Sequence, residues 1–140
     1  MNKINHRRVL LGGLVAGAVI NIGEYLLNEV VLVRQMEETF RRFSMPRPGA
    51  NFIALAVFLT LLLGIMIVLV YAMIRHRFGP GPRTAIVAAL LVWFCVYVYA
   101  GILSGALFAI PVHLLALGIV WGLVEYSFGA VLGAWVYKEA

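Results

Sequence analysis

Four long apolar stretches run through the chain, at residues 9–33, 52–74, 84–109 and 114–137. Each is at or above about 20 residues, the length that an α-helix needs to cross the hydrocarbon core of a bilayer. The segments between them are short and contain proline, glycine or charged residues, which interrupt helices. The pattern predicts an all-α fold, an integral membrane four-helix bundle that forms a single domain over residues 1–140.

The segment after the first stretch has a different pattern, because charged and apolar residues alternate along it with a helical period. Its apolar positions are Val33, Met36, Phe40 and Phe43. An apolar face of this kind opposite a charged face is typical of a helix that lies along the membrane surface. We therefore predict a short interfacial amphipathic helix over about residues 34–44. The charged end of an over-long first helix would give the same pattern.

Composition agrees with a membrane location. Hydrophobic residues make up 64% of the chain and charged residues 12%, and the mean hydropathy is +1.00. A soluble domain needs a far more polar surface, so we expect the lipid bilayer to surround this protein. The net charge of +5 does not indicate a nucleic-acid partner, because the basic residues fall at the ends of the apolar stretches.

The distribution of these basic residues predicts an orientation. One side of the membrane would hold Lys3, Arg7, Arg8, Arg75, Arg77, Arg83 and Lys138. The other side would hold Arg34, Arg41, Arg42 and Arg47. Since loops rich in lysine and arginine tend to remain in the cytoplasm, we expect both termini to be cytoplasmic.

Two glutamates interrupt the apolar stretches, Glu24 in the first and Glu125 in the fourth, and neither stretch offers a nearby lysine or arginine as a partner. An ionisable side chain inside hydrocarbon is expensive to place, so it is by default a hypothesis for a functional site. Helical rise puts Glu24 about 22 Å and Glu125 about 18 Å from the cytoplasmic ends of their spans. We therefore expect the two carboxyl groups at one level of the membrane.

Small residues accompany both glutamates at helical spacing. The stripe in the first span consists of Gly13, Gly17, Asn21, Glu24 and Asn28. The stripe in the fourth span consists of Gly118, Gly122, Glu125, Gly129 and Gly133. Glycines at this spacing allow two helix backbones to approach closely. We therefore predict that all six glycines are helix-packing positions and that both glutamates lie on packing faces, away from lipid.

Two desolvated carboxylates without a cationic partner cannot both remain ionised, because burial and mutual repulsion favour the protonated form. They would share a proton, hold a cation or contact water. Tyr97 in the third span lies at a similar depth, and Asn21 and Asn28 could supply further neutral oxygens. We predict a proton-binding or cation-binding site made of Glu24, Glu125, Asn21, Tyr97 and Asn28.

This site favours a small proton-linked or cation-linked transporter or permeation pathway. The alternative is a non-catalytic accessory or assembly subunit of a larger membrane complex, in which two protonated glutamates would only join helices. Either protein would be expected to form a homo-oligomer or to bind partner membrane subunits. A third interpretation, a lipid-modifying enzyme, rests on acidic and histidine residues near the predicted interfaces, namely Glu29, Glu37, Glu38 and His113.

We expect no catalytic centre, no metal site and no cofactor. The sequence contains no nucleophile elbow, phosphate-binding loop or zinc-protease motif. Haem usually needs an axial histidine, and only His113 would touch the membrane. The single cysteine, Cys95, lies in an apolar run and has no partner for a disulfide within the chain.

Four segments carry a resemblance to a known group of proteins. They are Val-Leu-Leu-Gly-Gly-Leu-Val-Ala-Gly at residues 9–17, Asn21-Ile22-Gly23-Glu24, Gly79-Pro80-Gly81-Pro82-Arg83-Thr84-Ala85 and Val120-Trp121-Gly122-Leu123-Val124-Glu125. With these segments the chain resembles small bacterial inner-membrane proteins of unknown function that have four spanning helices. The resemblance implies a four-helix architecture and a bacterial inner-membrane location.

Overall fold

Four helical spans make up most of the molecule: His6–Val31, Ala50–Phe78, Pro82–Leu107 and Val112–Val136. The structure, a computed structural model, describes residues 4–137, and no strand occurs among them. Each span is long and apolar enough to cross a membrane. The predicted all-α bundle is therefore confirmed, and the protein is a small multi-pass membrane protein.

The first span consists of the α-helix α1 (His6–Leu26) and a π-helical segment, η1 (Leu27–Val31). Asn5 caps α1, because its side-chain oxygen accepts a hydrogen bond of 3.2 Å from the Arg8 N–H. The span therefore begins and ends a few residues earlier than the predicted range of 9–33.

The amphipathic segment forms a helix of its own, α2 (Val33–Arg42). Leu32 separates it from the first span, since its backbone leaves the helical conformation at φ −105° and ψ 14°. The charged residues are thus not a simple extension of the first span.

The second span is one helix, α3 (Ala50–Phe78), which runs past the predicted end at residue 74. It stops where Gly79 adopts a φ of 82°, a conformation that favours glycine. The third span is built from α4 (Pro82–Trp93), a second π-helical segment η2 (Phe94–Ala100) and α5 (Gly101–Leu107). Pro82 is its first residue. Proline suits this position because the first N–H groups of a helix have no partner within the helix, so the missing proline N–H costs no hydrogen bond.

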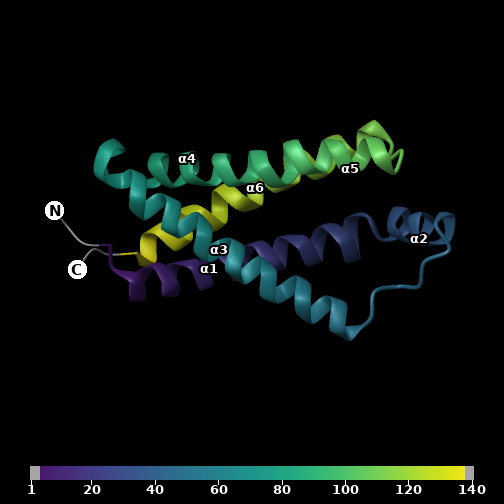
Figure 1. The fold of residues 1–140 in the computed structure, drawn as a ribbon, viewed down its shortest axis with the longest axis horizontal. Coiled ribbons are helices and arrows are strands. Elements are labelled where there is room, and N and C mark those ends of the chain that lie inside the picture. The colour runs from purple at the N-terminus through teal and green to yellow at the C-terminus, as the bar shows by residue number, and fades with distance from the viewer. Residues whose placement is uncertain (1–3, 138–140) are drawn as a thin grey trace.

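The fourth span, α6 (Val112–Val136), returns alongside α1 and α4. Figure 1 shows that both ends of the chain and the connection between α3 and α4 lie at one end of the molecule, here called the terminal end. The opposite end, here called the loop end, carries α2 and the turn between α5 and α6, and α3 diverges from α1 toward it (Figure 1). Consecutive spans run in opposite directions, and α1 packs against both α3 and α6.

Glycines allow α1 to pack closely on both neighbours. A Cβ atom added to Gly64 of α3 would collide with the backbones of Gly13 and Gly17. On the other side of α1, a Cβ atom on Gly133 of α6 would lie 2.7 Å from the carbonyl oxygen of Gly12. Helix backbones that approach each other this closely gain van der Waals contact along their length.

The six predicted packing glycines therefore have different roles. Gly13 and Gly17 pack against α3, while Gly129 and Gly133 pack against α1. The prediction for Gly118 is wrong, because an added Cβ atom there would meet nothing within 4 Å.

We predict that Gly64→Ala lowers the stability of the protein in detergent, because the new methyl group has no room against the backbone of α1. Overpacking of this kind typically costs about 1–3 kcal/mol. Gly118→Ala is the matched control and should leave stability unchanged or raise it by up to about 1 kcal/mol, since alanine is the better helix former. Thermal unfolding followed by circular dichroism measures both variants. Equal melting temperatures would contradict the packing described for Gly64.

Candidate functional site

Three spans bring the two glutamates together. Glu24 lies near the end of α1, Glu125 lies in the middle of α6, and Tyr97 reaches between them from η2. The Tyr97 hydroxyl donates a hydrogen bond to Oε1 of Glu24 and lies 2.8 Å from Oε1 of Glu125. We call these three residues the Glu–Tyr–Glu cluster.

The hydroxyl of Tyr97 constrains the protonation of the cluster. A phenolic O–H has one proton to donate, and its oxygen can accept a hydrogen bond in return. If Tyr97 donates to one carboxyl group, the other must be protonated and donate to Tyr97 for both contacts to be hydrogen bonds. The geometry therefore accommodates at least one proton shared between two carboxyl groups and one hydroxyl.

The second oxygen of each carboxyl group, Oε2, accepts a hydrogen bond from a neutral side chain that lies one helical turn away on the same span. Asn28 Nδ2 donates to Glu24 Oε2 at 3.0 Å and to the Glu24 carbonyl oxygen at 2.8 Å. Trp121 Nε1 lies 3.2 Å from Glu125 Oε2 and 3.1 Å from the carbonyl oxygen of Gly23. These bonds fix the direction of both carboxyl groups, and Trp121 also ties α6 to α1.

Two glycines provide the space for the cluster. A Cβ atom on Gly23 would collide with Oε2 of Glu125 and lie 3.1 Å from its Cβ atom. A Cβ atom on Gly122 would lie 2.5 Å from Cδ2 of Tyr97. Gly122 is a packing position, as the stripe predicts, because the ring of Tyr97 from the third span lies directly against it.

Both π-helical segments lie at the cluster. Tyr97 belongs to η2, and Asn28 belongs to η1, which begins three residues after Glu24. A π-helical turn contains an extra residue and therefore changes the direction of the side chains that follow it; such turns occur frequently at functional sites.

The cluster is closed toward the terminal end and less so toward the opposite end. Glu125 is only 6% exposed, and the neighbouring layer of Ile20, Tyr126 and Ala130 is almost completely buried. Tyr126 also packs edge to face against Tyr97, with 5.3 Å between ring centroids. Glu24 is half-buried, and Val30 and Leu103, which lie on the loop side of the cluster, are exposed. The loop side of the cluster is therefore its less buried side.

Four of the five residues predicted for the site come together: Glu24, Glu125, Tyr97 and Asn28. Asn21 does not join them. Its side-chain amide donates to the carbonyl oxygens of Gly17 at 3.0 Å and Val57 at 3.3 Å, so it connects α1 to α3. The common stripe on α1 placed Asn21 near Glu24, but the crossing of α3 gives it a different neighbour.

Sequence reasoning did not include Trp121 and Gly23 in the site. A signal for Trp121 was present, since an indole N–H four residues before an intramembrane glutamate lies on the same helix face. Gly23 had no such signal, because its role depends on the side chain of Glu125 from another helix.

The residues behind the enzyme interpretation are dispersed. Glu37 pairs with Arg47 at the loop end, and no group of three or more His, Cys, Asp or Glu residues that could hold a metal ion occurs within residues 4–137.

Comparisons of the chain with models of protein families, with curated proteins and with solved structures found no match.

The hydrogen-bond geometry predicts a protonated carboxyl group in the wild-type protein near neutral pH. Infrared spectroscopy detects it by the carbonyl stretch of a carboxylic acid. Glu24→Gln should weaken this band, because the glutamine N–H can donate permanently to Tyr97 and leave Glu125 ionised. Glu38→Gln, at an exposed position of α2, is the matched control and should not change the band. Absence of the band from the wild type, or an equal loss in both variants, would contradict the shared proton.

Proposed function

We propose that this protein conducts protons within the membrane, through Glu24, Tyr97 and Glu125, as a small transporter or permeation pathway. The observation that supports this function is the single hydroxyl placed between two carboxyl groups. When protonated Glu125 gives its proton to the Tyr97 oxygen, Tyr97 gives its own proton to Glu24. The charge moves from one carboxyl group to the other while the heavy atoms stay in place.

The contacts favour a proton over a metal cation. The carboxyl oxygens face the N–H groups of Asn28 and Trp121 and the O–H group of Tyr97. N–H groups carry partial positive charge and would repel a cation at the same oxygens. Hydrogen-bonded acidic side chains inside a membrane are, by contrast, the usual components of proton relays.

An accessory subunit would use the same glutamates differently. If they served only to join helices, we would expect them to form hydrogen bonds with backbone groups in a tightly packed, dry seam. Here the two carboxyl groups are bonded to side chains, and Glu24, Tyr97 and Asn28 are half-buried. This arrangement supports the proton pathway as the better proposal.

The π-helical segments offer a way to interrupt the relay. If η2 changed to an α-helical turn, the helix register would shift by one residue, which rotates a side chain by about 100°. Tyr97 would then no longer reach both glutamates. We propose that such a change alternates between a connected and a disconnected cluster.

We further propose that the protein belongs to a bacterial inner membrane, with both termini in the cytoplasm. The excess of lysine and arginine in the segments predicted to lie on the side of the termini supports this orientation. The resemblance to small bacterial inner-membrane proteins supports the location. An inner membrane that maintains a proton gradient would supply the driving force.

Proton flux in reconstituted vesicles tests the function. The vesicles carry a pH-sensitive dye and a clamped membrane potential, and the wild-type protein should dissipate an imposed pH gradient. Glu24→Gln and Glu125→Gln each remove a titrating group, and Tyr97→Phe removes the connecting hydroxyl. We expect each to reduce flux by about 100-fold or more, the effect typical of a positioned proton-transfer group.

The control for this experiment is Glu38→Gln, the same chemical change at an exposed position of α2, which should retain wild-type flux. Wild-type protein that conducts no better than empty vesicles would overturn the proposal, as would undiminished flux in the cluster variants. Stoichiometric co-purification of another membrane subunit, without flux, would support the accessory function instead.

A further inference from the structure

A second site lies at the terminal end, separate from the Glu–Tyr–Glu cluster. It is a pocket of about 460 Å³ where α3 ends, α4 begins and α6 ends. All three elements meet there at the ends of membrane spans (Figure 1), which is the depth of lipid headgroups. Among its lining residues are Tyr71, Arg75, Pro82, Val131, Trp135 and Tyr137.

The positively charged part of the pocket is held in place by aromatic rings. The Arg75 guanidinium carbon lies 5.7 Å from the ring centroid of Tyr71 and 5.2 Å from that of Tyr137. Both tyrosines are buried, and their hydroxyls accept hydrogen bonds from the N–H groups of Gly81 and Asn5. Because rings at this distance attract a cation, Arg75 presents its charge at a defined position on the pocket wall.

The rest of the pocket is largely apolar. Val131 and Trp135 of α6 line it, and Trp135 is 80% exposed in the last turn of the fourth span. A tryptophan at the end of a span typically lies at the level of lipid headgroups. The pocket thus combines a cationic group with an apolar wall that continues toward the hydrocarbon region.

The charge around the pocket favours an anionic occupant. Four exposed arginines lie near this end: Arg7, Arg8, Arg77 and Arg83. Basic pockets at the ends of membrane spans are suited to anionic lipid headgroups.

We propose that this pocket binds an anionic phospholipid, with its phosphate beside Arg75 and an acyl chain along Val131 and Trp135. Charge selects the headgroup, and the apolar wall of α6 favours a lipid over a small soluble anion. The proposal does not depend on proton conduction, since the pocket and the cluster share no residue.

Native mass spectrometry of the full-length protein in detergent tests the site. The protein is equilibrated with equal amounts of phosphatidylglycerol and phosphatidylcholine, and the bound lipid is counted. The wild type should retain phosphatidylglycerol preferentially. Arg75→Gln should weaken its binding by more than about fivefold, because fivefold corresponds to the general surface effect of about 1 kcal/mol per basic residue and Arg75 lies in the pocket itself. Trp135→Ala, at an exposed position, should weaken binding without a change in net charge.

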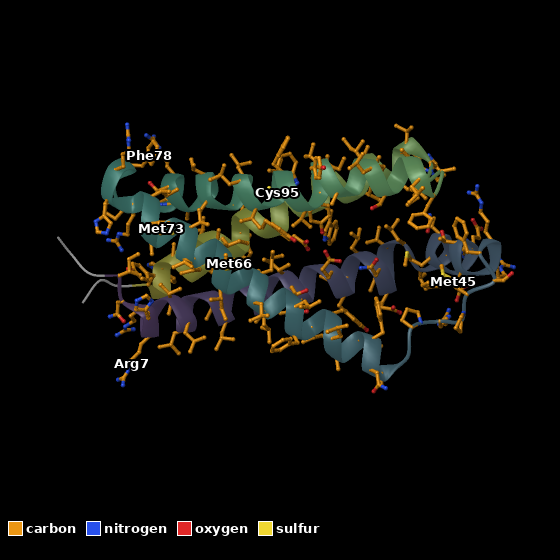
Figure 2. All side chains as sticks on the ribbon, viewed as in Figure 1. Arg7, Met45, Met66, Met73, Phe78 and Cys95 are labelled. Carbon is orange, nitrogen blue, oxygen red and sulfur yellow. The ribbon has the colours of Figure 1, made fainter. Side chains whose placement is uncertain are left out.

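Arg7→Gln is the matched control, because it removes the same charge from a side chain that points away from the bundle (Figure 2). It should keep the wild-type preference to within about twofold, less than the loss expected at the pocket. Equal losses in Arg7→Gln and Arg75→Gln would show general surface attraction and overturn the site, as would equal retention of both lipids by the wild type. Displacement of the lipid by inorganic phosphate would overturn the assignment to a phospholipid. If Arg75→Gln does not fold, as judged by circular dichroism, Trp135→Ala decides the outcome.

Discussion

The hydrogen bonding of one tyrosine hydroxyl between two carboxyl groups is the interaction on which the functional account depends. Inside a bilayer, water does not stabilise an ionised glutamate, so the protein must supply hydrogen bonds or the group must take up a proton. Tyr97 provides both possibilities, because it can donate to one carboxyl group and accept from the other. Asn28 and Trp121 complete the remaining hydrogen bonds of the two carboxyl groups.

Close approach of the helices makes this arrangement possible. Without side chains on Gly23 and Gly122, the carboxyl group of Glu125 and the ring of Tyr97 fit directly against the neighbouring backbone. The glycines nearer the terminal end serve the same purpose for helix packing, where Gly64 meets Gly17. Glycines therefore allow close helix packing near the terminal end and leave space for the cluster in the middle of the bundle.

The sequence was sufficient to predict the four spans and the association of Glu24 with Glu125 and Tyr97, because hydropathy and helical periodicity depend on local order along the chain. It was insufficient for Asn21 and Gly118. Both share a helix stripe with a glutamate, but residues on one stripe can meet different neighbours: Asn21 bonds to α3, and a Cβ atom on Gly118 would meet nothing within 4 Å. The two π-helical segments also had no signal in the sequence, because an apolar run is equally compatible with an α-helix and a π-helix.

The most direct test of the account is solid-state nuclear magnetic resonance of the protein in lipid, with ¹³C-labelled glutamate. Labelled chains are diluted in unlabelled chains so that signals between carboxyl carbons arise within one molecule. The account predicts a through-space correlation between the Cδ atoms of Glu24 and Glu125, and a chemical shift typical of a protonated acid for at least one of them. No correlation, or two shifts typical of ionised carboxylates, would contradict it.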